Sequence, residues 1–578
     1  MLSKKRFVAF TLVLLIFSLT LATLKLYLPA HLPDSFPNSQ SRPTEQAEST
    51  EPIEQTATTT ATLSLDVAEP VKEPPLPLEY YMEPDGDGTC SRFSPSYLDD
   101  FHAHTASYCS PESPAQLTCF HRFSGLDGKT DSLCYAQGAV LDAKKGKFYL
   151  NCDLRQLSDE EKDNGVLPFS RLPSYWYETG PRNIFSAAID VRASKDASAI
   201  KRAKNGNKEK KSDPQSIPHA VATESAPSIT PPRTILLLKR EGAGNPWHCL
   251  MEIFSTFITF DILRMPGGVS GDQPPLFSDP SDSQDTQVVV LDDHPNGPYF
   301  DLWTLFAKRK PLRLAELLSD QATVDNLASV NLIIPLAGSS NPFWKDDAEA
   351  GQCANSPNLN VFSRRVLDFY GVKHPPSRVR GEPILVTWVW RQHRRLKNEN
   401  TLLAELGRRN PHITVRMIDF AALPFGEQAR IAQESDVLVG VHGAGLTHSM
   451  FMRQGAGAVV EIQPEEFEHH GFRNVAGMRN LGYFRTHAKS IEAENWSAGE
   501  TGEAVDSMQN GRGMDDGIRR EAARDDDHII TTAEREEKLG KRDWHVKDVE
   551  IEEDRFFEIV ETAIKFMYTK GPWSLDVN

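Results

Sequence analysis

The chain has 578 residues, with 63 basic against 80 acidic side chains and a formal net charge of −17 at pH 7. Nucleic acids are polyanions that are bound by basic surfaces, so this balance argues against a nucleic-acid partner.

The N-terminus carries a predicted membrane anchor. A basic cluster ending at Arg6 precedes the uncharged apolar stretch Phe7–Leu24, whose length just reaches the lower limit of about 17 residues for a spanning helix. The weak small-residue site around Ala22 favours an uncleaved anchor over a removed signal peptide. Because a positive flank stays cytoplasmic, residues 1–6 form a cytoplasmic tail, and we expect a type II protein of the Golgi or endoplasmic reticulum membrane with a luminal catalytic domain.

Three segments cannot bury enough apolar surface to offset the entropy of ordering them. They are predicted to be disordered: a stem at residues 25–77, an insertion at 193–232 and a charged insertion at 492–541. The second segment contains a basic cluster. Because the whole chain carries a net charge of −17, we interpret this cluster as part of a solvated insertion and not as a nucleic-acid site. Asn495 begins the sequon Asn-Trp-Ser and is the predicted N-glycosylation site.

Residues 78–192 form a Cys-containing N-terminal region. Five of the seven cysteines lie between Cys90 and Cys152, where an oxidising lumen favours disulfides. No Cys-x-x-Cys or His-Cys spacing indicates zinc. The odd total leaves at least one thiol free or paired between chains, and the sequence does not decide the connectivity.

Apolar runs alternate with helical patterns from residue 233 to 491, which predicts parallel sheets covered by helices in an α/β fold. Residues 233–380 are assigned to a first domain, 381–491 to a second, and 542–578 to a C-terminal helix and tail. The expected strands are Thr234–Leu238, Gln287–Leu291 and Leu332–Pro335, then Ile384–Trp390, Ile413–Ile418, Val437–Val441 and Ala458–Ile462. The expected helices include Gly297–Lys308, Val361–Tyr370, Glu427–Glu434 and Glu552–Tyr568.

The strand Val437–Val441 breaks into a Gly-rich turn that runs from His442 to His448. Gly443 and Gly445 allow a tight turn and the approach of a ligand without interference from a Cβ. A helix that starts there directs N–H groups and its positive dipole end at an anion such as a diphosphate, with the two histidines as added donors. An ordinary structural turn is the alternative.

Charged side chains follow two strands of the same half. Arg391, Arg394 and Arg395 come after Ile384–Trp390, and guanidinium groups bind phosphate oxygens bidentately without a metal. A solvated basic loop is the alternative. Glu461 lies near the end of the strand after the Gly-rich turn, at the sheet edge where α/β folds bind ligands, and would accept hydrogen bonds from ribose hydroxyls.

The stretches Trp388–Glu399 and Asp436–His448 resemble glycosyltransferase family 61. That family includes EGF-domain-specific O-GlcNAc transferases, a protein O-mannose β-1,4-GlcNAc transferase and plant β-1,2-xylosyltransferases. The resemblance covers roughly half of the chain, in pieces between about Arg233 and Tyr568. This sequence departs from the family at Trp390, where a serine usually precedes the first arginine, and has one residue fewer before the arginine pair.

The resemblance implies a GT-B fold, in which two Rossmann-like doubly wound domains border a cleft, the first on the acceptor side and the second on the nucleotide-sugar side. It implies inverting transfer from a UDP-sugar, GlcNAc favoured and xylose next, to a protein or glycan hydroxyl. No obligatory cofactor is expected. The predicted donor-binding residues are Arg391, Arg394, Arg395, Asn398, His442, Gly443, Ala444, Gly445, Leu446, His448 and Glu461.

The resemblance extends to Asn245–Phe254, whose counterpart is a first-domain helix that faces the cleft. His248 and Glu252 lie one helical turn apart and would share a face. Either a carboxylate orients an imidazole base, or Glu252 itself takes the hydroxyl proton, so both are candidate catalytic residues. A satisfied core histidine is the alternative for His248.

No obligatory metal is expected. Asp292 and Asp293 follow a strand, where adjacent side chains point to opposite faces. GlcNAc-transferring animal members of the family carry an Asp-x-Asp pair, and the matching stretch here, Ala307–Pro311, lacks it, which also weakens the case for an EGF-domain substrate. The competing hypothesis is a catalytically inactive luminal protein that binds a sugar or nucleotide on the same fold.

Overall fold

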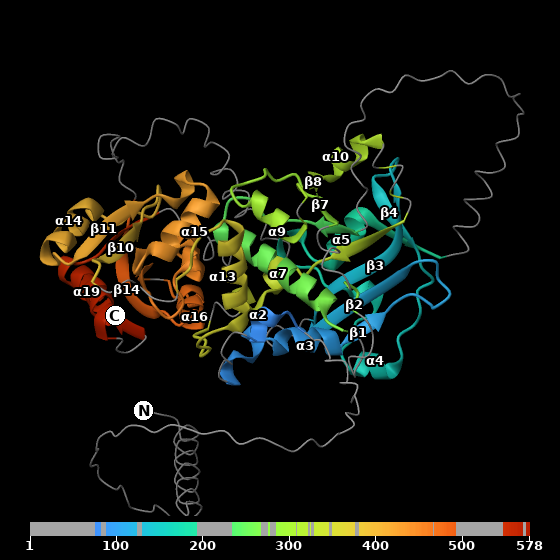
Figure 1. Cartoon of the computed structure of the whole chain (residues 1–578), viewed down its shortest axis with the longest axis horizontal. Helices are drawn as coiled ribbons and strands as arrows, with labels where there is room; N and C mark the ends of the chain where they lie inside the picture. The colour runs from blue at the N-terminus through green and yellow to red at the C-terminus, as the bar shows by residue number, and fades with distance from the viewer. Residues whose placement is uncertain are drawn as a thin grey trace, which may run out of the picture. The chain divides into compact units, whose positions relative to one another are not determined.

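The computed structural model describes residues 76–81, 88–123, 130–193, 234–266, 275–277, 285–375, 381–492, 547–569 and 574–577, apart from residue 466 and some positions between 308 and 348 (Figure 1). The predicted anchor Phe7–Leu24, nearly all of the stem and the sequon at Asn495 lie outside these residues. The two predicted insertions, residues 193–232 and 492–541, also lie almost entirely outside the described residues. Within the described part of the chain, no helix combines the length and apolar character needed to cross a bilayer.

The first sheet has nine strands: β1 (Thr105–Ser107), β2 (Gln116–Phe123), β3 (Thr130–Asp142), β4 (Lys147–Asn151), β5 (Ile189–Arg192), β6 (Thr234–Leu238), β7 (Thr286–Val290), β8 (Leu312–Arg313) and β9 (Val330–Ile334). The order β9-β6-β7-β8 is parallel, as predicted. However, β3 pairs antiparallel with β9, and β2 and β1 continue outward from it. The expectation of a purely parallel sheet is wrong here, because strands of the Cys-containing region cover the edge of β9.

The buried helix of this half is α7 (Pro246–Arg264). Asn245 caps it by accepting a hydrogen bond from the N–H of Trp247, and Pro246 occupies the first helical position, where its missing N–H costs nothing. Apolar side chains surround the helix on nearly all sides, which is the pattern of a core helix. Its first turn therefore has a fixed position, and His248 lies in that turn.

The second sheet has seven strands: β10 (Ile384–Val389), β11 (Ile413–Ile418), β12 (Val437–Val441), β13 (Ala458–Pro464), β14 (Gly482–Ile491), β15 (Asp548–Glu550) and β16 (Ser574–Val577). The order β11-β10-β12-β13-β14 is parallel throughout, which confirms the predicted strands. Strand β15 pairs antiparallel with β14, and β16 pairs parallel with it. The carboxyl ends of β10, β12 and β13 thus share one edge.

Helices near the second sheet are α14 (Glu399–Arg409), α15 (Phe425–Glu434), η7 (Ala444–Phe451), α16 (Gly471–Met478) and α19 (Glu553–Thr569). Figure 1 shows α19 beside β14, and its apolar face joins the core of the second sheet through Phe556, Ile559 and Val560. The family resemblance implies a last helix that crosses back to the first domain. In this structure the helix packs on the second sheet instead, because its apolar face is buried against β12, β13 and β14.

The remaining helical segments are short, except for α13. They are α2 (Leu78–Tyr81), η1 (Gly88–Phe93), α3 (Ser96–Ala103), α4 (Asp159–Asp163), η2 (Phe169–Arg171), η3 (Trp176–Glu178), α5 (Pro181–Ala188), η4 (Phe300–Trp303), α9 (Thr304–Ala307), α10 (Leu314–Ser319), η5 (Gly338–Ser340), α12 (Pro342–Lys345), α13 (Pro357–Phe369) and η6 (Phe420–Ala422). The predicted helix at 297–308 is thus reduced to η4 and α9.

Three disulfides join six of the cysteines. Cys109–Cys152 and Cys119–Cys134 lie within the Cys-containing region, and Cys90–Cys353 spans 263 residues. Cys249 is a buried free thiol on α7. The sequence left this connectivity open, since only folding brings residues 90 and 353 together.

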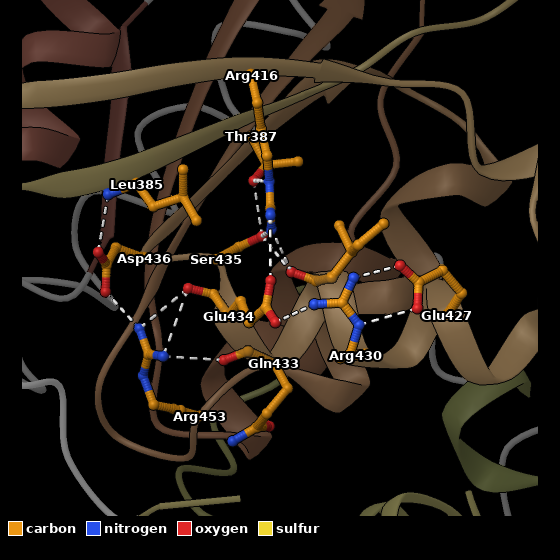
Figure 2. A network of polar contacts seen from close by, with 11 residues as sticks. Leu385, Thr387, Arg416, Glu427, Arg430, Gln433, Glu434, Ser435, Asp436 and Arg453 are labelled. Carbon is orange, nitrogen blue, oxygen red and sulfur yellow. Dashed lines mark hydrogen bonds and ion pairs between the residues drawn. The ribbon is translucent and has the colours of Figure 1, made fainter. Parts of the chain in front are cut away.

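Arginines at the amino ends of the second-sheet strands are held by protein acceptors (Figure 2). The guanidinium of Arg453 binds Asp436, whose other carboxylate oxygen accepts the N–H of Leu385 at 2.8 Å. Arg416 reaches Glu434 at 3.2 Å. These contacts join β10, β12 and α15, and they show how the fold neutralises arginines that serve structure.

Candidate active site

The turn after β12 brings an arginine against the backbone. Gly443 has φ +148°, a region that favours glycine, and η7 begins at the next residue, Ala444. A Cβ at Gly443 would overlap the guanidinium of Arg391. Nη1 of Arg391 donates to the carbonyl oxygen of His442 at 2.6 Å. The first N–H groups of a helix have no hydrogen-bond partner within it. The guanidinium of Arg391 therefore lies beside the N–H groups that begin η7.

Arg391 and Arg394 form a positive site past the end of β10. Burial lowers the pKa of Arg391 to about 10. Burial and the nearby charge of Arg391 hold the pKa of Arg394 well below its usual range. Among the described residues, no carboxylate lies within ion-pair distance of Arg391. A phosphate beside Arg391 would supply negative charge and raise the pKa of that guanidinium again.

Arg395 does not join this site. Its Nη2 lies 2.6 Å from Oε1 of Glu399, and the two side chains are 5% and 3% exposed. Its backbone N–H donates to Asp548 at 2.8 Å. A buried ion pair thus ties Arg395 to α14, and its predicted donor contact stays a prediction. Asn398 is exposed at the start of α14 with φ +60° and makes no side-chain capping bond.

His442 is buried at the end of β12 and faces Glu461 on the neighbouring strand. Its Nδ1 lies 2.5 Å from Oε1 of Glu461, and the hydroxyl of Tyr483 donates to Oε2 at 2.5 Å. An ionised carboxylate only accepts, so His442 carries its proton on Nδ1. Burial lowers the pKa of His442 to about 4, which keeps the ring neutral near pH 7. Burial alone would raise the pKa of Glu461, but the bonds from His442 and Tyr483 bring it below its usual value.

Glu461 therefore orients a histidine. Both carboxylate oxygens are occupied and the side chain is fully buried, so in this structure Glu461 is directed at His442 and Tyr483, and its predicted contact with ribose hydroxyls stays a prediction. Tyr483 was missed because β14 was not predicted. It lies opposite Val459, which shares a face of β13 with Glu461, so recognition of that strand would have found it.

His448 is a satisfied core histidine. Its Nδ1 lies 2.8 Å from the carbonyl oxygen of Gly445, and its Nε2 lies 2.6 Å from Oε1 of Gln428. The ring stacks on Phe420 with centroids 4.0 Å apart, and the residue is 1% exposed. Both ring nitrogens have protein partners in this structure, and the predicted role of His448 as a donor ligand stays a prediction.

Gly445 and Leu446 serve packing. A Cβ at Gly445 would lie 2.7 Å from Cγ1 of Val389 on β10, so this glycine lets η7 approach the sheet. Leu446 is fully buried, and its N–H donates to the carbonyl of Gly443 at 2.9 Å. Both positions pack against protein atoms. The backbone part of the predicted anion site is therefore formed by the amide groups around Ala444.

His248 faces a carboxylate that the sequence analysis missed. Its Nδ1 lies 3.5 Å from Oε2 of Glu241, and its side chain is 16% exposed. Its ring meets Trp344 and Tyr177 with centroids 4.3 and 5.5 Å away. The carboxylate that faces this imidazole is thus Glu241 rather than Glu252, although the two groups make no hydrogen bond in this structure. Glu241 follows β6 by a few residues, and that position at a carboxyl strand end was the available signal.

Glu252 is turned into the core. Its Oε1 accepts the N–H of Glu241, and within the described residues its Oε2 has no hydrogen-bond partner. Burial, and then the charge of Glu241, raise the pKa of Glu252 well above its usual value. It lines a small cavity with Cys249 and Tyr299. A protonated, enclosed carboxyl does not take a proton from a substrate, so His248 is the better candidate base.

Aromatic rings connect the two candidate groups. Trp247, next to His248, meets Phe472 edge to face with centroids 5.6 Å apart. Phe472 in turn lies 5.4 Å from the ring of His442. Ring contacts therefore run from Trp247, the sequence neighbour of His248, through Phe472 to His442.

The acidic pair after β7 has a structural partner. Asp292 binds Arg240 at 2.8 Å, with side chains 6% and 3% exposed. Among the described residues, no three His, Cys, Asp or Glu side chains gather where they could hold a metal ion. Independence from metal stays a prediction.

Residues 247–459 match the sequence profile of the family described as Glycosyltransferase 61. The EGF domain-specific O-linked N-acetylglucosamine transferase of Drosophila melanogaster is 24% identical over 270 residues, which cover 46% of this chain and 48% of that protein. The protein O-linked-mannose beta-1,4-N-acetylglucosaminyltransferase 2 of Mus musculus is 26% identical over 189 residues, 32% of each chain.

A third relative, the EGF domain-specific O-linked N-acetylglucosamine transferase of Gallus gallus, is 34% identical over 135 residues, 23% of this chain and 24% of that protein. The chain thus spans half or less of the length of these curated relatives. The profile match contains His248, Arg391 and His442, three of the residues predicted for the site. Over residues 247–459 the chain is therefore similar to glycosyltransferase family 61.

Proposed function

We propose that this chain is an inverting glycosyltransferase with a GT-B arrangement, which uses a UDP-sugar, GlcNAc first and xylose next, and glycosylates a protein or glycan hydroxyl. The observation that carries the proposal is the pair Arg391 and Arg394 beside the start of η7. Partly buried guanidinium groups and helix N–H groups at one strand end suit a diphosphate.

The proposed reaction needs three groups. His248, which faces Glu241, accepts the proton of the acceptor hydroxyl on Nε2. The acceptor oxygen forms a bond to the anomeric carbon from the face opposite the phosphate, and the bond from that carbon to the phosphate oxygen breaks. The electron pair leaves with UDP, whose charge Arg391 and Arg394 stabilise; one such donor typically contributes about 3 kcal/mol to the transition state.

The acceptor and donor proposals draw on the relatives. The printed names of two of them give N-acetylglucosamine as the transferred sugar, and one name gives O-linked mannose as the acceptor. A GlcNAc donor and a hydroxyl on a protein or on a protein-linked sugar are therefore proposed here. Location in the Golgi or endoplasmic reticulum, through the anchor Phe7–Leu24, belongs to the same proposal and is tested by carbonate extraction of membranes.

The test is a calorimetric titration of the full chain with UDP, followed by an assay for UDP-GlcNAc and UDP-xylose hydrolysis. Saturable UDP binding and hydrolysis of one donor support the proposal. UDP binding without turnover of either donor with any acceptor would favour the inactive binding protein. The absence of UDP binding would remove the nucleotide sugar from the proposal.

A further inference from the structure

Two large aromatic side chains stand exposed next to each other in η3. Trp176 is 63% exposed and Tyr177 is 38% exposed. Large apolar side chains are normally buried, and neighbouring exposed ones mark binding sites. The side chain of Trp176 takes no part in the contacts described above for the fold and the donor site.

The loop that carries these rings is held in an uncommon conformation. Tyr177 and Glu178 have φ values of +57° and +55°, a region that bulky residues rarely adopt. The N–H of Tyr175 donates to the carbonyl of Thr179 at 3.0 Å and closes the loop at its base. The hydroxyl of Tyr175 donates to a carboxylate on β3. Such conformations persist where the surroundings fix them, and they cluster at ligand-binding positions.

The loop is attached to the strand end that carries the candidate base. Nζ of Lys239 lies 3.2 Å from Oε2 of Glu178, and Lys239 comes two residues before Glu241. Tyr177 reaches the ring of His248, whose Nδ1 faces Glu241. Tyr177 therefore contacts the proposed base, and the exposed Trp176 is its neighbour in the chain.

We propose that Trp176 and Tyr177 bind a sugar ring of the acceptor, so that the acceptor is a glycan or glycosylated chain. The inference rests on the proposed function and names its acceptor class. A pyranose has an apolar C–H face, which suits the negative face of an aromatic ring, and a polar rim, which suits the charges of Glu178 and Lys239. A docked protein would need an interface of about 1,000 Å² with a larger apolar centre.

The experiment titrates the full chain with α-mannobiose, with chitobiose and with an unglycosylated Ser/Thr peptide, and follows the tryptophan fluorescence. Wild type is expected to bind one disaccharide saturably. Trp176→Ala should weaken that affinity about tenfold or more, and Trp176→Phe should restore most of it. Tyr568→Ala, which removes a 58% exposed tyrosine on α19, is the matched control and should leave the affinity unchanged.

Three results would overturn the inference: no disaccharide binds, Trp176→Ala binds the disaccharide as wild type does, or only the peptide binds and Trp176→Ala loses it. Each variant is also titrated with UDP. Failure of wild type to bind UDP contradicts the proposed function, whereas normal UDP binding without disaccharide binding contradicts only the acceptor site. Circular dichroism of each variant shows whether a loss of affinity reflects unfolding.

Discussion

The carboxylate of Glu461 bridges His442 and Tyr483 across three neighbouring parallel strands, with both oxygen contacts at 2.5 Å. His442 presents its carbonyl oxygen to Arg391 and its ring to Phe472. The geometry of the arginine site therefore depends on a histidine whose tautomer is set from the sheet.

Tyr483→Phe tests this dependence. Loss of the hydroxyl leaves one oxygen of a buried carboxylate without its donor, which costs about 1–3 kcal/mol. The ring of His442 loses its fixed orientation, and turnover should fall about tenfold, while UDP affinity changes little. The measurements are kcat, KM for the donor and the thermal midpoint. Tyr149→Phe, a partly buried tyrosine on β4, is the control, and wild-type turnover of Tyr483→Phe would contradict the bridge.

Arg391→Ala should weaken UDP binding tenfold to a hundredfold, because a charged hydrogen bond contributes about 1.5–3 kcal/mol. The fold should hold, since the described contacts of Arg391 include no ion pair. Arg408→Ala removes an arginine that is 73% exposed on α14, and calorimetry should find its UDP affinity unchanged. Equal affinities for wild type and Arg391→Ala would take this residue out of the site.

Gly443→Ala and Gly445→Val should fail for different reasons. At Gly443 a Cβ overlaps the guanidinium of Arg391 and the φ of +148° is strained, so UDP affinity should fall more than stability. At Gly445 the added atoms meet Val389, so the thermal midpoint should fall first. UDP titrations beside thermal melts separate the two, and identical behaviour of the variants would contradict the assignment.

His121 predicts a pH dependence of stability. Its Nε2 and Nδ1 lie 2.8 Å from the hydroxyls of Tyr108 and Ser132, and burial lowers its pKa to about 4. Between the usual pKa of about 6.5 and pH 4, the unfolded chain binds a proton that the folded chain does not. The free energy of unfolding should therefore fall with falling pH in that window, by roughly 1.4 kcal/mol per pH unit from this group. In urea melts, the free energy of unfolding of His121→Gln should change less steeply with pH than that of wild type. Equal slopes for the two proteins would contradict the prediction.

Donor hydrolysis should survive chelation. The basic groups that face the proposed diphosphate are arginines, which stabilise phosphate charge without a metal. Activity in excess EDTA should match that of untreated enzyme. The carboxylate of Asp292, which could otherwise bind a metal ion, is already bound by Arg240. Loss of activity on chelation, with recovery on added Mn²⁺ or Mg²⁺, would contradict the prediction.

Periodicity predicted the parallel strands well, because buried strands of α/β sheets are continuous apolar runs such as Val437–Val441. The roles of individual polar residues were harder to predict. Arg391 and Arg395 follow the same strand, and only the fold shows that Glu399 neutralises one of them. Likewise, Tyr483 reaches Glu461 from a neighbouring strand and Glu241 faces His248 from beyond the end of β6, which a chain read in order does not reveal.

The pairing of β3 with β9 decides which pieces of this protein can be produced alone. A fragment that begins at the profile match at residue 247 would lose β1 to β6, so both flanks of β9 would offer unpaired N–H and C=O groups to other chains. It would also leave Cys353 without Cys90. We expect such a fragment to aggregate, whereas one that begins before Leu76 and folds under oxidising conditions keeps the sheet edge closed.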